Sequence, residues 1–169
     1  GTGSIVFDHD NKIAYAALSP RTDKRLLLQL CEQLDYLPVT FTAHDRGRIE
    51  IYHTNVMMCI GEEFAVICLE SITDESERAN VFSKLATTGH EIVDITFDQM
   101  NSFAGNMLVM RNDLLVMSQS AFDSLTDPQK TALEKYCELL PLAIPTIETV
   151  GGGSARCMIA EIFLLPLNG

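Results

Sequence analysis

The sequence is poor in basic side chains, holds no long apolar run and shows no signal-peptide pattern at its start. Its 169 residues include 12 lysines and arginines against 23 aspartates and glutamates, a net charge of −11. Nucleic-acid binding depends on basic side chains that neutralise phosphates, so this balance argues against it. A membrane-spanning helix needs about 20 apolar residues, whereas the longest runs here are strand-sized, such as residues 65–69. The chain begins Gly-Thr-Gly-Ser, without the basic and apolar regions of a signal peptide. We therefore expect a cytoplasmic protein that binds neither nucleic acid nor a membrane.

The cysteines form no recognisable disulfide or metal framework. There are five of them, with no CxxC pair and no zinc-like spacing. Cys31 and Cys137 fall in helical patterns and Cys59 and Cys68 in strand patterns, so these four are expected to be core residues. Cys157 differs because it follows a glycine run, in GGGSARC. Glycine lets a backbone approach a ligand closely, but the stretch alone favours a flexible turn before a strand that happens to contain a cysteine.

A repeat organises the chain. Residues 1–18, 52–69 and 103–120 resemble one another, each with a strand, a polar turn and a second strand. Ser4, Asn55 and Asn106 hold the same place in these segments, 51 residues apart, and one further step of 51 reaches Cys157.

Each paired-strand segment is followed by a helix and then by another strand. The helices are expected at residues 21–35, 73–86 and 126–140, and the strands after them at 36–42, 91–97 and 143–150. Thr73 and Thr126 are the expected N-caps of the second and third helices. The apolar faces are expected to carry Leu26, Leu27, Leu30 and Leu34 in the first helix and Val81, Phe82 and Leu85 in the second. The unit is therefore strand–strand–helix–strand, present three times.

Repeats of this length stack around a common centre, which brings equivalent positions to one end of the assembly. Ser4, Asn55, Asn106 and Cys157 are therefore expected at one mouth of the central axis, with His53 beside them. A cysteine near a histidine base is a candidate nucleophile, so we predict a Cys157–His53 pair. The two asparagines either bind a polar ligand or form strand-end turns, and Arg156 either contacts a carboxylate or lies on the surface. The remaining histidines are expected to be solvated: His9, His44 and His90.

The segments YHTNVMM, FAGNMLVM and GGGSARCMIAEIF resemble the guanidino-group modifying enzymes, which include arginine deiminases and amidinotransferases. The closest likeness is to the citrulline-utilisation hydrolases, whose Glu-Gly-Thr-Gly-Ser segment is similar to the first residues here. The resemblance covers essentially the whole chain and implies the pentein fold, an α/β propeller of five strand–strand–helix–strand blades. This chain would be one domain with three blades, at residues 1–51, 52–102 and 103–150, and a closing strand at 154–165. The first two blades would be missing, so we expect a homo-oligomer or a missing N-terminal segment to cover the open side.

The resemblance also implies a mechanism that needs no metal or cofactor. Cys157 would be the nucleophile and His53 the general acid–base, while Gly152, Arg156 and Asn106 would contact an amino-acid substrate. Arginine deiminases carry aspartate two residues after the histidine, where this chain has Asn55. A charge-assisted hydrogen bond is worth about 1.5–3 kcal/mol and a neutral one about 1 kcal/mol, so an amide favours a neutral ureido group over a cationic guanidinium. We therefore predict a hydrolase that releases ammonia from a citrulline-like substrate. The alternatives are an arginine deiminase, an amidinotransferase, or a non-catalytic pentein binding module.

Overall fold

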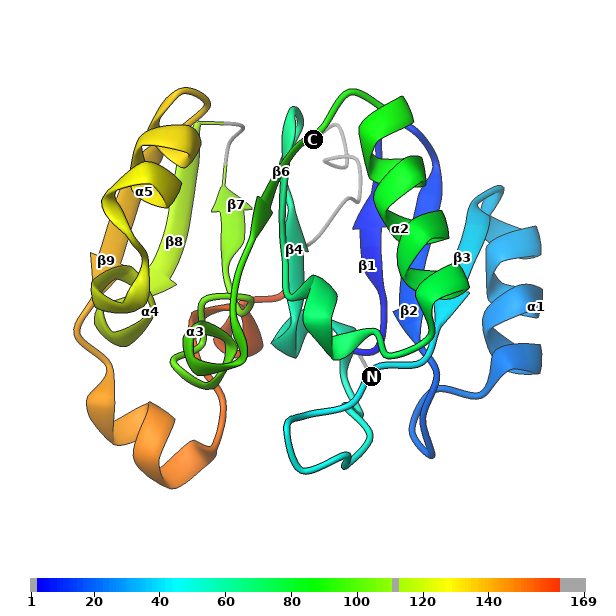
Figure 1. Cartoon of the computed structure of the whole chain (residues 1–169), viewed down its shortest axis with the longest axis horizontal. Coiled ribbons are helices and arrows are strands. Elements are labelled where there is room, and N and C mark those ends of the chain that lie inside the picture. Colours follow the sequence, from blue (N-terminus) through cyan, green and yellow to red (C-terminus); the bar gives the residue numbers. More distant parts are fainter. Residues whose placement is uncertain (1–2, 111–112, 162–169) are drawn as a thin grey trace, which may run out of the picture.

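Three small sheets stand side by side in the computed structural model, which describes residues 3–110 and 113–161 (Figure 1). The first unit consists of β1 (Val6–Asp8), β2 (Ile13–Ala17), α1 (Lys24–Leu34) and β3 (Leu37–Phe41). The second consists of β4 (Met58–Ile60), β5 (Phe64–Ile67), α2 (Glu75–Thr87) and β6 (Glu91–Asp94), and α3 (Phe97–Asn101) follows it. The third consists of β7 (Leu108–Met110), β8 (Leu114–Ser118), α4 (Gln119–Ser124), α5 (Asp127–Glu134) and β9 (Glu138–Leu142). In every sheet the first strand is antiparallel to the middle strand and the last is parallel to it, which confirms the predicted strand–strand–helix–strand order.

The core lies between the sheets. All five residues of β2 and all four of β5 are buried, as expected for middle strands covered on both faces. One apolar cluster runs through all three units, and α2 contributes its fully buried Val81 and Leu85 to it. Helix α2 packs against β3 of the first unit as well as against β6 of its own unit, so it fills the space between two sheets (Figure 1). No helix within the described ranges is both long and apolar enough to cross a membrane.

Side-chain caps fix where the helices begin. The Asp23 carboxylate accepts a hydrogen bond from the Leu26 backbone at the start of α1, and Asp74 does the same at the start of α2. The N-cap of α2 is therefore Asp74 and not the predicted Thr73, because the carboxylate one position later reaches the free N–H of Glu77. Thr126 caps α5 as predicted, in a reciprocal capping box with Gln129.

The largest errors of the sequence-based prediction lie after α5. The helix ends at Glu134 instead of residue 140, and residues 138–142 form β9, which pairs in parallel with β8. Pro141 and Pro145 disfavour helical backbone in the residues before them, and pairing with β8 satisfies the segment instead. The predicted strand at 143–150 is wrong, because Ile147–Gly151 forms a π-helical turn, η3.

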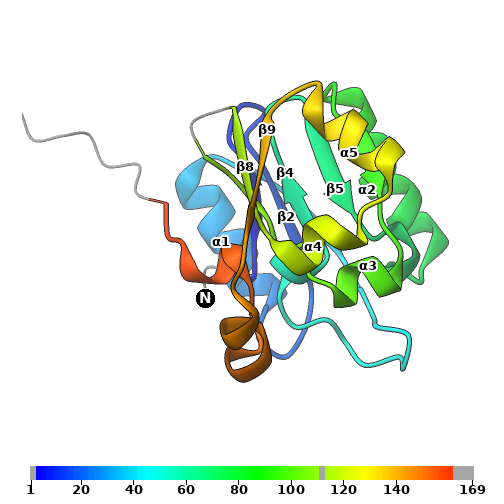
Figure 2. The ribbon, with the colours of Figure 1, turned by 90° about the vertical axis from the view of Figure 1, so that its left-hand side faces the viewer.

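The predicted closing strand at 154–165 is also wrong for the part that the structure describes. Ala155–Met158 forms a 3-10 turn, η4, closed by a hydrogen bond from the Cys157 N–H to the Ser154 carbonyl. Residues 162–165 lie outside the described residues. Figure 2 shows η4, in red, on the side of β8 and β9 opposite to α4 and α5.

Helix α1 presents a partly exposed apolar face. Of the four leucines predicted for this face, Leu27 is buried beside Cys31 against the first sheet, whereas Leu26, Leu30 and Leu34 are 58%, 37% and 48% exposed. The positions 51 residues after Leu30 and Leu34 are Val81 and Leu85, which are fully buried because β3 lies against α2. The face of α1 thus lacks the neighbouring sheet that α2 has. The predicted apolar side of α2 is also only partly right, because Phe82 is 49% exposed.

Candidate active site

The turns that begin the three units meet through a relay of hydrogen bonds. The Asn55 N–H donates to the Gly3 carbonyl at 3.1 Å, and the Asn106 side chain donates to the Asn55 carbonyl at 2.9 Å. The Arg156 N–H in turn donates to the Asn106 carbonyl at 3.4 Å. Each bond joins positions about one repeat apart, so the register found in the sequence corresponds to neighbouring positions in space. Asn55, Asn106 and the Cys157 segment lie together at one end of the molecule.

Cys157 is an exposed cysteine in contact with a buried amide. Its Sγ lies 3.3 Å from Asn106 Nδ2 and 3.5 Å from Asn106 Oδ1, and Asn106 is only 2% exposed. The amide N–H can donate to the sulfur, and Oδ1 can accept from the thiol. The other four cysteines are buried, as predicted. Burial raises the pKa of Cys59 to about 12 and that of Cys137 to about 11, which keeps both as unreactive thiols.

The glycine run shapes the approach to Cys157. Gly152 adopts a left-handed backbone (φ 64°) at the end of η3, where an added Cβ would meet nothing within 4 Å. Gly153 lies against Cys157, because a Cβ built there would lie 3.2 Å from both Cβ and Sγ of Cys157. The loop is anchored by Glu148, whose carboxylate accepts from Ser154 Oγ at 2.8 Å and from Ser120 Oγ at 2.7 Å. The sequence pattern gave no signal for Glu148, since its partners come from two separate segments.

Replacing Gly153 with alanine is expected to slow the alkylation of Cys157 by about tenfold, because the added methyl group pushes Sγ away from Asn106 and small misplacements of a reacting atom are costly. The rate of labelling by a chloroacetamidine-type electrophile, followed by intact mass, measures this. The matched control is Gly151→Ala, whose new Cβ would meet only Ile147 Cγ2, at an ordinary 3.8 Å. Equal labelling rates in both variants would contradict the prediction.

His53 is half-buried and immediately precedes the 3-10 turn η1 (Thr54–Val56). Gly3 lies against it, since a Cβ at Gly3 would come 3.0 Å from His53 Nδ1 and 2.9 Å from Asn55 Oδ1. Burial lowers the pKa of His53, and the positive charge of Arg21 lowers it further. The imidazole is therefore more completely neutral at pH 7 than a free histidine. His53 joins the cluster through Asn55, whose carbonyl is bonded to the Asn106 side chain that contacts Cys157.

The other histidines have different surroundings. His90 is buried and not solvated as predicted, because its ring lies between Thr88 Oγ1 at 2.9 Å and the buried Asp8 carboxylate at 3.7 Å. His44 contacts Thr73 at 3.4 Å on the exposed side, and His9 Nδ1 lies 2.7 Å from the Tyr36 hydroxyl.

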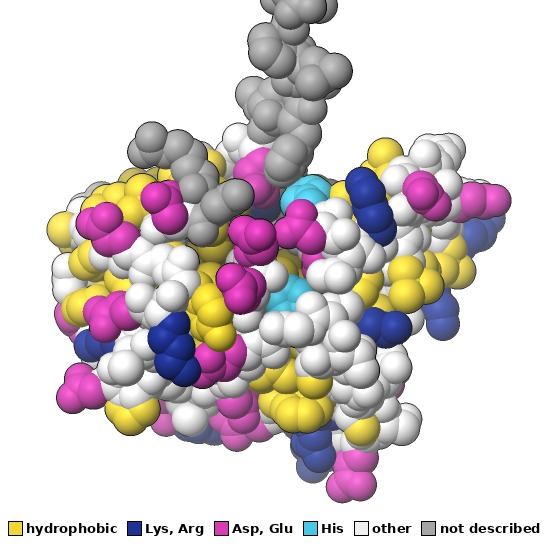
Figure 3. Space-filling view, turned by 90° about the horizontal axis from the view of Figure 1, so that it is seen from above, with side chains coloured by type: hydrophobic (Ala, Val, Ile, Leu, Met, Phe, Trp, Pro, Cys, Tyr) yellow, Lys and Arg dark blue, Asp and Glu magenta, His cyan; other side chains and the backbone are white. Residues whose placement is uncertain are grey.

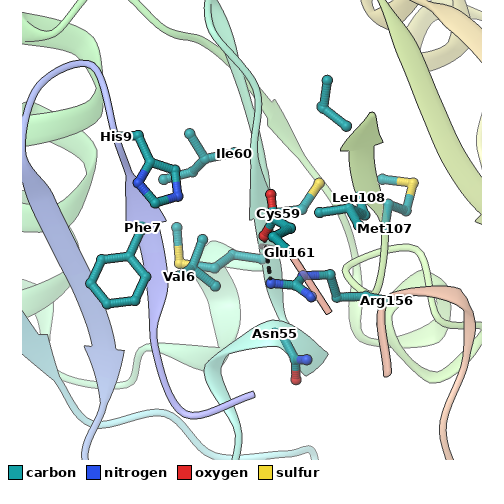
Figure 4. A pocket seen from close by; sticks show the side chains of 12 residues that line it. Val6, Phe7, His9, Asn55, Cys59, Ile60, Met107, Leu108, Arg156 and Glu161 are labelled. Atoms are coloured by element: carbon teal, nitrogen blue, oxygen red, sulfur yellow. Dashed lines mark hydrogen bonds and ion pairs between the residues drawn. The ribbon is translucent and has the colours of Figure 1, made fainter. Parts of the chain in front are cut away.

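A small cavity between the first strands of the three units extends from this cluster. It measures about 80 Å³, and β1, β4 and β7 supply its walls together with Asn55 and Arg156 (Figure 4). The Arg156 guanidinium donates to the Glu161 carboxylate at 3.0 Å and to the Ile159 carbonyl at 2.9 Å, so the arginine does contact a carboxylate, one from its own chain. Asn55 Oδ1 is buried and has no hydrogen-bond partner among the described residues. An unpaired buried acceptor is the kind of group that a ligand N–H satisfies.

The opposite end of the molecule is acidic. Asp8, Asp10, Glu62 and Glu161 line a hollow beside the hairpin turns of the first two units, and Figure 3 shows acidic side chains gathered around it.

The row of strand–strand–helix–strand units, with equivalent turns meeting at one end, defines an α/β propeller of the pentein type, the fold of the guanidino-modifying superfamily. The chain belongs to the eukaryotic N,N-dimethylarginine dimethylhydrolase family, whose model matches residues 1–164. The predicted superfamily and fold class are thereby confirmed.

Solved structures agree with this fold. ArgZ, an arginine dihydrolase of the ornithine–ammonia cycle in cyanobacteria, is 16% identical with a TM-score of 0.76 over 94% of this chain and 24% of its own. The product-bound N-terminal domain of ArgZ is 17% identical, with a TM-score of 0.74 over 94% of this chain and 54% of that one. SxtG, an amidinotransferase from Microseira wollei, is 9% identical, with a TM-score of 0.63 over 92% of this chain and 42% of its own. The chain thus spans 54% of the ArgZ N-terminal domain and less than half of full-length ArgZ and of SxtG. No curated protein matches it.

Proposed function

We propose that this chain carries the nucleophile and the general acid–base of a cysteine-dependent hydrolase that cleaves a C–N bond in a guanidino or ureido compound. The observation that carries the proposal is the exposed Cys157 thiol in contact with the buried Asn106 amide, which also bonds to the carbonyl of Asn55, two residues after His53. The family is named for dimethylarginine hydrolysis, and the similar structures are an arginine dihydrolase and an amidinotransferase, all of them acting on guanidino groups. The partner would be a small amino-acid substrate, and no step needs a metal or cofactor.

The proposed reaction has two halves. In the first, Cys157 Sγ bonds to the central carbon of the substrate, a C–N bond breaks, and ammonia leaves with the proton that the thiol gave up through His53. In the second, neutral His53 takes a proton from water, the hydroxide attacks the thioester-like carbon, and the C–S bond breaks to regenerate the thiol. A ureido substrate would yield a carbamic acid in this step and a guanidino substrate a urea. The lowered pKa of His53 suits the second half, which needs the neutral imidazole.

We propose further that the substrate is neutral and citrulline-like. Asn55 Oδ1 is a buried acceptor that a ureido N–H would satisfy, and an amide provides no negative charge to hold a cation. Asn106, already bonded to Asn55 and Cys157, and Arg156, beside the cavity, would complete the contacts with the substrate. Gly152, which adopts a left-handed backbone in the loop before Cys157, would contact the substrate through its main chain.

The Asn55→Asp variant is expected to shift the preference between citrulline and arginine by about tenfold toward arginine, since a charge-assisted hydrogen bond exceeds a neutral one by roughly 1–2 kcal/mol. Ammonia release from both substrates, assayed with the longest natural form of the protein, measures kcat/KM for each. The control is Asn106→Asp, which places a carboxylate beside Cys157. A wild-type protein that strongly prefers arginine would overturn the citrulline proposal and leave the arginine deiminase or amidinotransferase alternative.

The exposed leucines of α1 support the proposal that an N-terminal segment or a second copy of the chain completes the assembly.

Five free cysteines, one of them exposed, fit a reducing compartment, so we propose a cytoplasmic location. A protein that neither labels at Cys157 nor releases ammonia from any of these substrates would favour the non-catalytic binding module.

A further inference from the structure

Tyr52 contacts both a cation and the histidine of the cluster. The guanidinium carbon of Arg21 is 4.7 Å from the centroid of the Tyr52 ring, and the His53 ring centroid is 4.7 Å from the same ring at an interplanar angle of 59°. Arg21 belongs to the turn between β2 and α1 in the first unit, whereas Tyr52 and His53 precede η1 in the second. The three side chains form a stack, Arg21–Tyr52–His53, that crosses the boundary between two units.

The Ser19 hydroxyl links the segment that carries Arg21 to the segment that carries Tyr52 and His53. Ser19 Oγ donates to the Tyr52 carbonyl at 3.2 Å and accepts from the Arg21 N–H at 3.2 Å. The Thr22 N–H bonds back to the Ser19 carbonyl at 2.9 Å, which closes the turn that carries Arg21. The turn therefore contacts Tyr52 twice: Ser19 bonds to its carbonyl and Arg21 lies against its ring. These two contacts define the position of the guanidinium relative to Tyr52 and hence to the adjacent His53.

We propose that Arg21 and Tyr52 are positioning residues for His53: the stack fixes the orientation of the imidazole and places a permanent positive charge behind it. The inference rests on the proposed role of His53 as the acid–base. Planar guanidinium and aromatic rings stack readily, and lysine cannot reproduce that geometry. Gly3 lies against Nδ1 of His53, where a Cβ would come within 3.0 Å of the ring nitrogen.

The charges around His53 act in one direction. Its pKa is lowered first by burial and then by Arg21. A cation beside a histidine disfavours the protonated ring, so removing the Arg21 charge has to raise this pKa toward its usual 6.5. A purely structural role for Arg21 predicts no such movement.

The test is a pH titration of the four histidine rings by NMR, in the wild-type chain and in four variants of the stack. R21Q removes the charge, R21K keeps the charge but loses the planar stack, Tyr52→Leu removes the ring, and Tyr52→Phe keeps it. His9, His44 and His90 serve as internal references for folding. The matched control is Lys130→Gln, which removes a similar cation 4.3 Å from the Phe122 ring, away from His53.

We expect R21Q to raise the pKa of His53, Tyr52→Leu to raise it as well, and Tyr52→Phe and Lys130→Gln to leave it in place. R21K should retain most of the lowering and change the chemical shifts of the ring. A His53 titration that is the same in wild type, R21Q and Tyr52→Leu would overturn the proposal. Failure of the proposed function would give a different result. In that case His53→Gln would leave the labelling rate of Cys157 unchanged, while R21Q would still raise the pKa of His53.

Discussion

Replacing Cys157 with serine is expected to abolish covalent labelling by a chloroacetamidine-type electrophile and to reduce ammonia release by a factor on the order of 10⁴ or more. The serine hydroxyl is a far weaker nucleophile than a thiol, so the first half of the reaction cannot proceed. Stability should change little, because the side chain is exposed and its sulfur is held by the Asn106 amide. Intact mass before and after labelling, with the adduct mapped by digestion, gives the stoichiometry directly.

The control for this experiment is Cys31→Ala. Cys31 is 2% exposed, and burial raises its pKa, so its thiol is expected to be inert and the variant to label once, at Cys157. The buried Cys68, whose pKa burial raises to about 12, should also stay unlabelled. Slow labelling distributed over several cysteines of the wild-type chain would contradict the assignment of Cys157 as the nucleophile.

Replacing His53 with glutamine should lower both the labelling rate at Cys157 and the rate of turnover, the latter by about 10²–10⁴-fold, the usual contribution of a general acid–base. The pH profile gives the sign of the effect. Because the pKa of His53 lies below its ordinary value, the neutral imidazole persists below pH 6.5, and the wild-type rate should fall only as the pH drops through this lowered pKa. His53→Gln should lose that acid limb altogether.

The His44→Gln variant provides the comparison, since the His44 ring contacts Thr73, at 3.4 Å, outside the cluster. Its pH profile should match that of the wild type. If His53→Gln retained the wild-type rate and the same acid limb, another group would have to be the base, and the proposed pairing with Cys157 would be wrong.

The parts of the fold that could be predicted are those that depend on residues close together along the chain. Thr126 and Gln129 specify the start of α5 because a capping box needs only residues three positions apart. Residues 138–142 escaped prediction because their helix-like spacing of apolar residues is overridden by pairing with β8, which no local pattern reports. The same holds for His90, whose burial depends on Asp8 from another unit.

The candidate site followed from the repeat register and not from any single motif. The 51-residue spacing predicted that Asn55, Asn106 and Cys157 would be neighbours, and the structure brings them together. It could not indicate which glycine faces Cys157, because the answer depends on the backbone angles of the π-helical turn before it. Nor could it indicate the Arg21–Tyr52 contact, which depends on how the turn after β2 lies against the second unit.

The uncovered leucines of α1 have a consequence for how this chain unfolds. In a linear array whose members bind only their neighbours, stability is the sum of each member's own free energy and the coupling across each junction. Among the described residues, β1 and β3 of the first unit pack against the second unit, and α1 packs against β3 of its own sheet. Helix α1 should therefore be the first segment to exchange its amide hydrogens, while α2, clamped between two sheets, should be among the last. A chain of this kind begins to unfold at one end, and a segment or partner that covers that end stabilises all the units coupled to it.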